Sequence, residues 1–366
     1  MTSAPLDNVH PGIASLRPYQ PGKPIDELAR ELGIDDIIKL ASNENPRGPG
    51  EVVQAAIARE LASVSRYPDG NGFILKQALV NQLQVDAEQL TLGNGSNDVL
   101  DLIARVAVEP GYEAVVSAHS FVVYRLAVTC AGGVLVEVPA LNYGTDLQAM
   151  AEAITERTRA VFIANPNNPT GTWVSRDALV QFLDQVPDHV WVVLDEAYFE
   201  YANEPDYPDA LTLLPQYNNL IVTRTFSKVH GLAALRVGYG VSSAAFADLL
   251  NRARQPFNVN SVGLAAAAAA LGDQEFVTES VTLNNQGMTQ LITGLQGLGL
   301  EHIPSLGNFV AFDCGRDAQG VFEALLQQGV IVRPIAEYGL PQHLRVSVGL
   351  AEENQRFLQA LPRALA

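Results

Sequence analysis

Between residues 90 and 240, short apolar runs rich in β-branched residues alternate with amphipathic segments. The runs begin near residues 115, 134, 160, 190, 220 and 235. Helical patterns alternate with them, such as one from Asp98, before the first run, and one from Arg176. Ser175 is placed to cap the second of these helices. Strands that alternate with helices form parallel sheets whose faces the helices cover. The sequence therefore predicts an α/β fold with a mainly parallel sheet and helices on both faces.

The pattern changes after Gln255. Two long helical patterns follow, one near residue 265 and one from Asp273 to about Leu298, and then short strand-like runs at 308, 331 and 344 alternate with helical segments. This predicts a smaller α+β domain. The first 45 residues contain several prolines and little regular period, which predicts an arm that packs on another surface. The expected division is an N-terminal arm at 1–45, a large domain at 46–255 and a small domain at 256–366.

Length and charge narrow the possible partners. The 366 residues suffice for about two domains. The 23 Lys and Arg against 40 Asp and Glu give a net charge of -17. Such a chain repels a nucleic-acid backbone and an anionic membrane surface, so we expect neither as a partner. An anionic small molecule remains possible where arginines gather locally.

The two cysteines, Cys130 and Cys314, lie far apart and form no CxxC pair. This usage is typical of a reducing compartment. The first twenty residues contain no basic stretch followed by an apolar run, and the longest apolar segment, residues 264–271, is shorter than a membrane span. We therefore expect a cytoplasmic protein.

Four polar segments stand at the ends of strand-like segments. They are GNGSND at 93–98, NPNNPTG at 165–171, DEAY at 195–198 and TRTFSK at 223–228. Ligands of open α/β sheets bind at the carboxyl ends of strands, which favours a shared site. Structural alternatives remain open at this point: a capped helix after Gly95, a turn at 165–171, an ion pair for Asp195 and a solvated surface amine for Lys228. Motifs for P-loops, zinc proteases, serine hydrolases and Rossmann dinucleotide sites are absent.

In order and spacing, these segments together with GLAALRVGY, NFVAF and LRVSVG resemble the fold-type I pyridoxal-phosphate aminotransferases, and within them the histidinol-phosphate branch. The resemblance runs from about Tyr19 to the last helix. It implies pyridoxal 5'-phosphate as cofactor and transamination between L-histidinol phosphate and 2-oxoglutarate, giving imidazole-acetol phosphate and glutamate in histidine biosynthesis.

By this resemblance, Lys228 would bond covalently to the cofactor and then move the proton between substrate and cofactor. Asp195 would hydrogen-bond the pyridine nitrogen and keep it protonated, so that the ring accepts electrons. Asn168 and Tyr198 would hydrogen-bond the phenolic oxygen of the ring. Phe121 would stack on the ring where the family commonly has a tyrosine.

The same resemblance assigns the remaining site positions. Ser96, Asn97, Ser227 and Arg236 would hold the cofactor phosphate, with Arg236 supplying a guanidinium fork. Tyr67 would reach the phosphate bound by a neighbouring subunit, which implies a homodimer with shared active sites.

The anionic end of the substrate would be gripped by Arg345. Arg333 and Tyr19 would lie around the same end. Asn43 belongs to a segment that would enter the site from the N-terminal arm.

The chain departs from the common family pattern at Val229, His230 and Ala234, and His230 is interpreted as a packing residue. No metal site is expected, because the other histidines have no metal-ligand spacing; they are His10, His119, His189, His302 and His343. Three alternative functions stay open: an aromatic amino-acid aminotransferase, a lyase like the phosphothreonine decarboxylases, and a non-catalytic sensor. Retention of Lys228, Asp195 and Arg236 speaks against the sensor.

Overall fold

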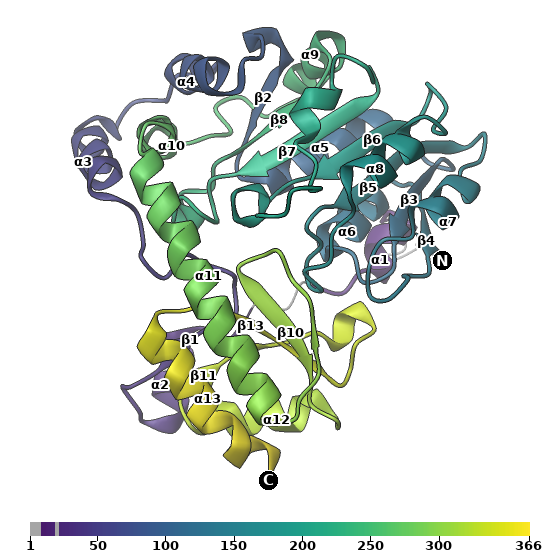
Figure 1. Ribbon diagram of the computed structural model, residues 1–366. Coiled ribbons are helices and arrows are strands. Elements are labelled where there is room, and N and C mark those ends of the chain that lie inside the picture. The colour runs from purple at the N-terminus through teal and green to yellow at the C-terminus, as the bar shows by residue number, and fades with distance from the viewer. Residues whose placement is uncertain (1–8, 19–21) are drawn as a thin grey trace, which may run out of the picture.

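The computed structural model describes residues 9–18 and 22–366 of the chain. Figure 1 shows an upper unit built on a seven-stranded sheet and a lower unit built on a four-stranded sheet. The long helix α11 (Gln274–Gly297) begins beside the upper unit and runs down along the lower one (Figure 1). The predicted fold class, an α/β protein with a mainly parallel sheet and a smaller α+β part, is confirmed.

The strands of the large sheet lie in the order β2-β8-β7-β6-β5-β3-β4. All neighbouring pairs are parallel except those of β8, which is antiparallel to both β2 and β7. The six predicted runs form β3 to β8. The bounds are Leu90–Gly93 (β2), Glu113–Ser117 (β3), Val134–Val138 (β4), Thr158–Ala164 (β5), Trp191–Asp195 (β6), Leu220–Thr225 (β7) and Gly238–Val241 (β8).

Helices cover both faces of this sheet, as the apolar strands require. Side chains alternate along β5, so Val161 joins the core beneath α4, α8 and α10, while Phe162 joins the core beneath α5, α6 and α9. Ser175 caps α8 by accepting a hydrogen bond from the Ala178 backbone, as predicted. The helices are Glu51–Glu60 (α3), Phe73–Leu83 (α4), Ser96–Ala107 (α5), Val122–Cys130 (α6), Leu147–Glu152 (α7), Arg176–Leu183 (α8), Ala244–Ala253 (α9) and Ser261–Leu271 (α10).

The lower unit packs α11, α12 and α13 around the sheet β12-β13-β10-β9. Its neighbouring strands are antiparallel. The elements are His302–Ile303 (β9), Phe309–Asp313 (β10), Ala318–Leu326 (α12), Val330–Ile331 (β11), Arg333–Pro334 (β12), His343–Ser347 (β13) and Ala351–Leu365 (α13). Short 3-10 helices are Leu61–Ser63 (η2), Ala87–Gln89 (η3), Phe199–Tyr201 (η4), Ala210–Leu213 (η5), Ala233–Leu235 (η6) and Ala336–Tyr338 (η7).

The N-terminal segment packs on its own chain where it is described. It contains α1 (Pro11–Ser15), α2 (Ile25–Leu32) and β1 (Ile38–Lys39), and β1 pairs in parallel with β11. Leu28 of α2 is buried together with Ala41 and Ile331. The arm is therefore less irregular than its composition predicts, and its segment from α2 to β1 packs on the lower unit of the same chain.

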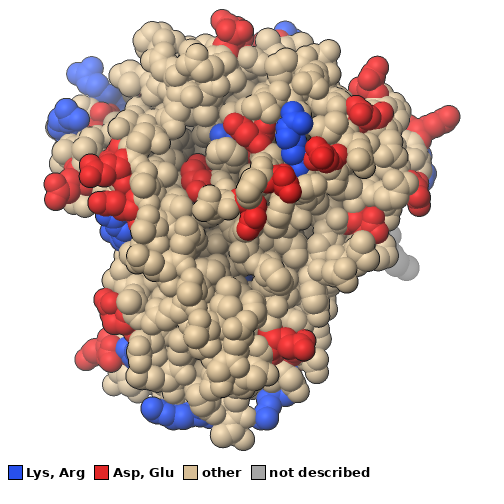
Figure 2. Space-filling model, viewed as in Figure 1, with Lys and Arg blue, Asp and Glu red and all other residues tan. Residues whose placement is uncertain are grey.

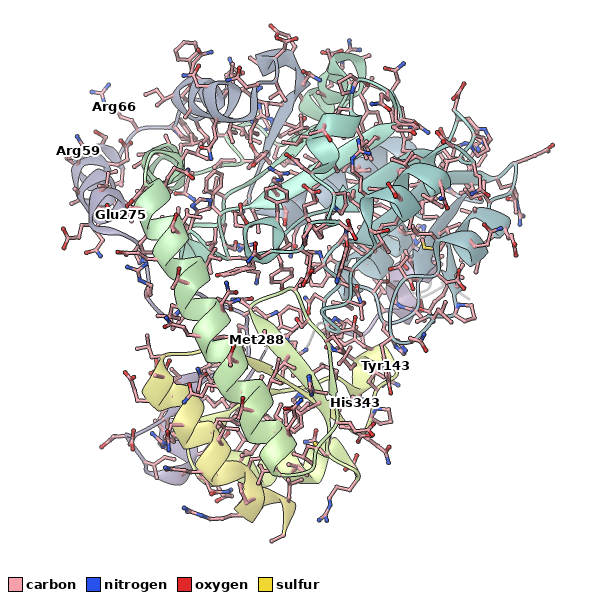
Figure 3. All side chains as sticks on the ribbon, viewed as in Figure 1. Arg59, Arg66, Tyr143, Glu275, Met288 and His343 are labelled. Atoms are coloured by element: carbon pink, nitrogen blue, oxygen red, sulfur yellow. The ribbon has the colours of Figure 1, made fainter. Side chains whose placement is uncertain are left out.

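The core to which each helix contributes indicates where the boundary between the two units lies. Ala266 and Ala267 of α10 are buried in the core of the large sheet, whereas Leu291 and Leu295 of α11 belong to the core of the lower unit. We therefore propose that the second unit begins near α11 rather than at residue 256. At one contact between the units, Tyr143 lies beside His343, with ring centroids 5.6 Å apart (Figure 3). Among the described residues, no helix combines the length and apolar character needed to cross a membrane.

Candidate active site

The polar strand ends meet at one cavity. Strands β2, β3, β5, β6 and β7 run in the same direction, so the segments that follow them leave the sheet at one edge. Strand β8 runs the opposite way, so its start lies at this edge, and Arg236, two residues before β8, lies there too. The predicted residues that line the cavity are Asn43, Ser96, Asn97, Phe121, Asn168, Asp195, Tyr198, Ser227, Lys228, Arg236, Arg333 and Arg345.

Asp195, the last residue of β6, is buried and faces this cavity. Its carboxylate oxygens accept hydrogen bonds from the hydroxyls of Tyr124 at 2.9 Å and Thr223 at 3.0 Å. Burial raises the pKa of the Asp195 carboxyl to about 6, while these hydrogen bonds and the charge of Lys228 oppose the rise. The carboxylate can therefore pair with a cationic ligand atom near neutral pH.

Lys228 brings the one ammonium group found among the described residues that line the cavity. Its Nζ donates a long hydrogen bond of 3.4 Å to the carbonyl oxygen of Ser42. The same nitrogen lies 5.4 Å from the centre of the Tyr198 ring. An amine beside an aromatic face, whose charge interacts with the carboxylate of Asp195, can act as a nucleophile and as a proton carrier.

Asn43 links the two units next to this lysine. Its amide nitrogen donates to the hydroxyl of Tyr198 at 2.9 Å, and its amide oxygen accepts from the hydroxyl of Ser347 at 2.9 Å. The Ser347 hydroxyl also accepts from the Asn43 backbone at 2.8 Å. Asn43 is almost fully buried, so these bonds fix the arm against β13 and fix the phenol of Tyr198.

A cradle of glycines and polar groups lies at the start of α5. Gly95, with φ of 82°, precedes Ser96, the first residue of the helix. A Cβ at Gly95 would lie 2.4 Å from the guanidinium of Arg236, and one at Gly238 would lie 2.3 Å from the Ser96 backbone nitrogen. Arg236 also donates to the Ser227 hydroxyl at 3.2 Å. Helix N–H groups, hydroxyls and a guanidinium suit a phosphate.

Two arginines lie side by side on β12 and β13, at the edge of the cavity that the lower unit supplies. Arg345 is buried and donates hydrogen bonds to the side-chain oxygen of Asn168 and, at 2.7 Å, to the carbonyl oxygen of Ala41. Arg333, its partner in the sheet, forms an ion pair with Glu337 at 2.5 Å. Planar guanidinium groups in this position can bind phosphate or carboxylate oxygens.

One predicted site residue that the structure describes, Tyr67, does not line this cavity. Tyr67 is 83% exposed and stacks on Phe257, with ring centroids 4.8 Å apart. Its action on the site of a second subunit stays a prediction. Tyr19 lies outside the described residues.

Sequence reasoning missed several residues around the site. The hydroxyls of Tyr124 and Thr223 donate hydrogen bonds to Asp195. The carbonyl oxygen of Ser42 accepts a hydrogen bond from Lys228, and the hydroxyl of Ser347 donates one to Asn43. Tyr338 lines the cavity. Tyr124 follows Phe121 by one helical turn, and Thr223 is paired with Asp195 across neighbouring strands. The helical period points to Tyr124 as a neighbour of the site, and the strand order, once known, points to Thr223.

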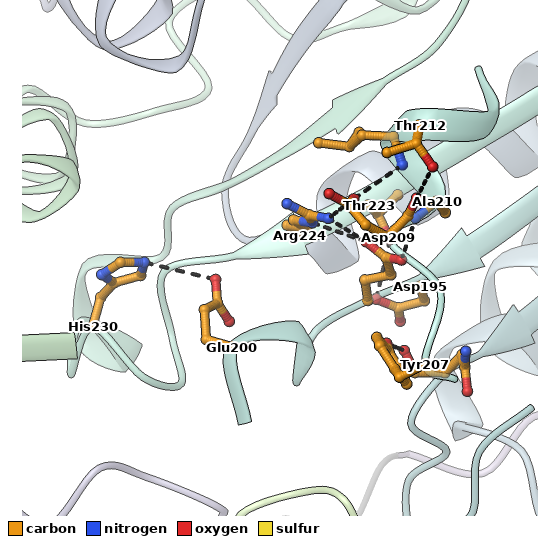
Figure 4. A network of polar contacts seen from close by, with 12 residues as sticks. Asp195, Glu200, Tyr207, Asp209, Ala210, Thr212, Thr223, Arg224 and His230 are labelled. Carbon is orange, nitrogen blue, oxygen red and sulfur yellow. Dashed lines mark hydrogen bonds and ion pairs between the residues drawn. The ribbon is translucent and has the colours of Figure 1, made fainter. Parts of the chain in front are cut away.

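A buried ionic network backs the site (Figure 4). Glu196 accepts two hydrogen bonds from Arg224, at 2.9 and 2.7 Å, and Arg224 also pairs with Asp209 at 2.8 Å. Nearby, burial raises the pKa of Glu200 to about 7 and lowers that of His230 to about 4, so the two do not form a strong ion pair at 3.8 Å. Because Glu196 follows Asp195, its pairing with Arg224 anchors the end of β6 from the opposite side.

The three positions that depart from the family pattern do not line the cavity. Val229 and His230 are buried, and the ring of His230 packs against Phe226 at 5.0 Å between centroids. Ala234 is exposed. His230 therefore packs in the interior, in agreement with its interpretation from sequence.

Comparison with known proteins gives a consistent result. Residues 35–361 match the family model of class I and II aminotransferases. The chain is 58% identical to histidinol-phosphate aminotransferase 2 of Pseudomonas fluorescens and 59% identical to that of Pseudomonas aeruginosa, each over 97% of both chains. Its fold is similar to the crystal structure of histidinol-phosphate aminotransferase from Sinorhizobium meliloti in complex with pyridoxal-5'-phosphate. That likeness has a TM-score of 0.90 at 32% identity and covers 98% of this chain and 97% of the other.

Proposed function

The chain belongs to the class I and II aminotransferase family, and we propose that it transfers an amino group between L-histidinol phosphate and 2-oxoglutarate. The products are imidazole-acetol phosphate and glutamate, and the reaction belongs to histidine biosynthesis. The observation that carries the choice of substrate is the identity of 58 to 59% to two histidinol-phosphate aminotransferases over almost the whole of each chain.

The enzyme uses pyridoxal 5'-phosphate, and the donor groups of the cavity fit this cofactor. The cofactor phosphate fits the cradle at Ser96 and Arg236. Positions 95 and 238 are glycines there, because a Cβ at either position would collide with Arg236 or with the backbone of Ser96. A pyridinium nitrogen needs a buried carboxylate such as Asp195. When bound, the cofactor withdraws electrons from the substrate carbon that carries the nitrogen.

The roles of the surrounding residues follow from their chemistry. Lys228 holds the cofactor through its amine and later moves the proton at the substrate carbon. Asp195 keeps the ring nitrogen protonated, and Phe121 stacks on the ring. Tyr198 and Asn168 hydrogen-bond the phenolic oxygen of the ring.

The phosphate of the cofactor is held by four residues that line one end of the cavity: Ser96, Asn97, Ser227 and Arg236. Substrate recognition falls to Arg345, with Arg333, Asn43 and Tyr19 around it. One guanidinium can serve both half-reactions, because a phosphate ester and a carboxylate both match its fork.

We also propose a homodimer with shared active sites. Exposed apolar side chains gather along the segment from α3 to α4 and include Leu61, Val64, Tyr67, Phe73 and Ile74. A patch of this kind marks an interaction site. Tyr67 is the most exposed member of this patch, although its ring stacks on Phe257, and it would reach the cofactor phosphate of a second copy.

The remaining partners are small molecules, without nucleic acid or membrane. On the face shown in Figure 2, acidic side chains are spread over both units and basic ones lie among them singly or in small groups. We propose a cytoplasmic location, because Cys130 and Cys314 are both free thiols.

A product analysis tests the reaction type. The enzyme is incubated with L-histidinol phosphate and 2-oxoglutarate, and glutamate and imidazole-acetol phosphate are quantified. Equal amounts of both are expected for transamination. The same enzyme is then given phosphothreonine alone, and release of carbon dioxide at a comparable rate would instead favour the lyase alternative.

A further inference from the structure

One buried tyrosine contacts the catalytic carboxylate without lining the cavity. Tyr124 lies on α6, one turn after Phe121, and is fully buried. Its ring stacks on Phe162, with centroids 5.2 Å apart, and meets the edge of Phe121 at 5.9 Å. Its hydroxyl donates to Oδ2 of Asp195 at 2.9 Å. The packing of the ring therefore fixes the direction of this hydrogen bond.

The other carboxylate oxygen has a donor of its own. Thr223, paired with Asp195 across β6 and β7, donates to Oδ1 at 3.0 Å. The other ionisable groups that interact electrostatically with Asp195 are Lys228, in the loop after β7, and Tyr207. Tyr198, in the segment after β6, lines the same cavity. The backbone N–H of Ala197 is a further donor to this carboxylate. The carboxylate is thus held by a hydroxyl on each oxygen and a backbone amide, and it keeps lone pairs for a ligand in the cavity.

We propose that Tyr124 is a positioning residue for the reaction: its hydroxyl, together with that of Thr223, holds the Asp195 carboxylate ionised and turned toward the ring nitrogen of the cofactor. The proposal rests on the function proposed above for Asp195. It adds a residue that touches neither substrate nor cofactor and acts through the carboxylate alone.

The electrostatics explain why such a donor is needed. A carboxylate without water tends to take up a proton, and a donor that binds the charged form opposes this. Burial raises the pKa of the Tyr124 phenol well above its ordinary value, so the phenol keeps its proton over the range in which Asp195 titrates. Tyr124 therefore remains a donor to the carboxylate while Asp195 titrates.

The sharpest test titrates Asp195 in the apoenzyme, where neither the amino donor nor the cofactor affects the result. The protein is labelled with aspartate carrying 13C in its carboxyl group, and the Asp195 signal is assigned by its loss in Asp195→Asn. Removal of a hydrogen bond to a charged group should raise the pKa of Asp195 in Tyr124→Phe by about one unit or more.

The matched control is Tyr217→Phe. The Tyr217 hydroxyl also donates to an aspartate, Asp184, at 2.7 Å, but at the surface and away from the cavity. This variant should leave the Asp195 titration unchanged. A pKa in Tyr124→Phe that stays within about 0.3 units of the wild-type value would overturn the proposal, whatever the substrate of the enzyme proves to be.

A second variant covers the case in which Tyr124→Phe does not fold. Difluorotyrosine placed at position 124 keeps the ring but is a stronger hydrogen-bond donor, so the pKa of Asp195 should fall. In the holoenzyme, cofactor labelled with 15N in the ring should show the nitrogen losing its proton at lower pH in Tyr124→Phe than in the wild type. An unchanged Asp195 pKa with difluorotyrosine would also contradict the proposal.

Discussion

The guanidinium of Arg345 donates a hydrogen bond to the side-chain oxygen of Asn168, 177 residues earlier in the chain. Arg345 lies in β13 of the lower unit, and Asn168 lies in the loop after β5 of the large sheet. In the proposed function one binds the substrate and the other binds the cofactor. This contact therefore couples the grip on the substrate to the position of the cofactor.

Replacing Arg345 by lysine should separate these tasks. Lysine is a point charge and cannot bond Asn168, the Ala41 carbonyl and an anionic substrate together. We expect Arg345→Lys to keep the cofactor but to lose about 2–4 kcal/mol of transition-state binding for both substrates. Measurement of kcat/KM for histidinol phosphate and for 2-oxoglutarate checks this. The surface variant Arg252→Lys serves as control, and a loss confined to one substrate would contradict the shared role.

The sequence alone predicts the parts of the fold that depend on local pattern. Strands β5 to β7 are buried on both faces and appear as continuous apolar runs, and Ser175 marks the start of α8. The resemblance to aminotransferases also placed twelve site residues that line one cavity.

Contacts between residues far apart in the sequence could not be predicted from local patterns. The bond from Tyr124 to Asp195 depends on how α6 packs beneath the end of β6, and neither residue signals it locally. Strand β1 is two residues long and pairs with β11 nearly three hundred positions later, so the arm shows no strand pattern of its own. Position in the sheet, rather than residue type, decides these contacts.

Lys228 should be the residue that carries the cofactor. Reduction of the holoenzyme with borohydride, followed by peptide mapping, should place the cofactor on the peptide that contains Lys228. Lys228→Ala should lose turnover while the phosphate cradle still binds the cofactor. Lys76→Ala, a substitution outside the cavity, should keep both turnover and label. A label on any other lysine would disprove the assignment.

Mixing two inactive variants tests the shared site. In the proposed dimer, Tyr67→Ala would damage the site of the neighbouring subunit, and Lys228→Ala would damage the site of its own subunit. In a mixed dimer one site carries both lesions and the other carries neither, so partial activity should return after subunit exchange. Exchange is verified with subunits of different mass. If exchange occurs and activity does not return, Tyr67 does not act across the interface.

Stability should depend on Glu200 and on pH. Burial raises the pKa of Glu200 to about 7, above its ordinary value, so the folded state binds this proton more tightly than the unfolded state. The favourable contribution is complete at low pH and is lost as the pH rises through about 7. The stability of Glu200→Gln relative to wild type, measured as the free energy of unfolding, should therefore be about 2 kcal/mol higher at pH 8.5 than at pH 5. Denaturant unfolding at both pH values measures this, with the exposed Glu275→Gln as control; an equal gain at both would contradict the burial argument.

The substrate is the central claim, and the most direct measurement compares amino donors. The values of kcat/KM for L-histidinol phosphate, phenylalanine and tyrosine are determined side by side with 2-oxoglutarate as acceptor. Because Arg345 and Arg333 favour an anionic phosphate end, histidinol phosphate should exceed both aromatic amino acids by about a hundredfold, equal to about 2.7 kcal/mol of transition-state binding. Values for phenylalanine or tyrosine that match or exceed that of histidinol phosphate would contradict the assignment.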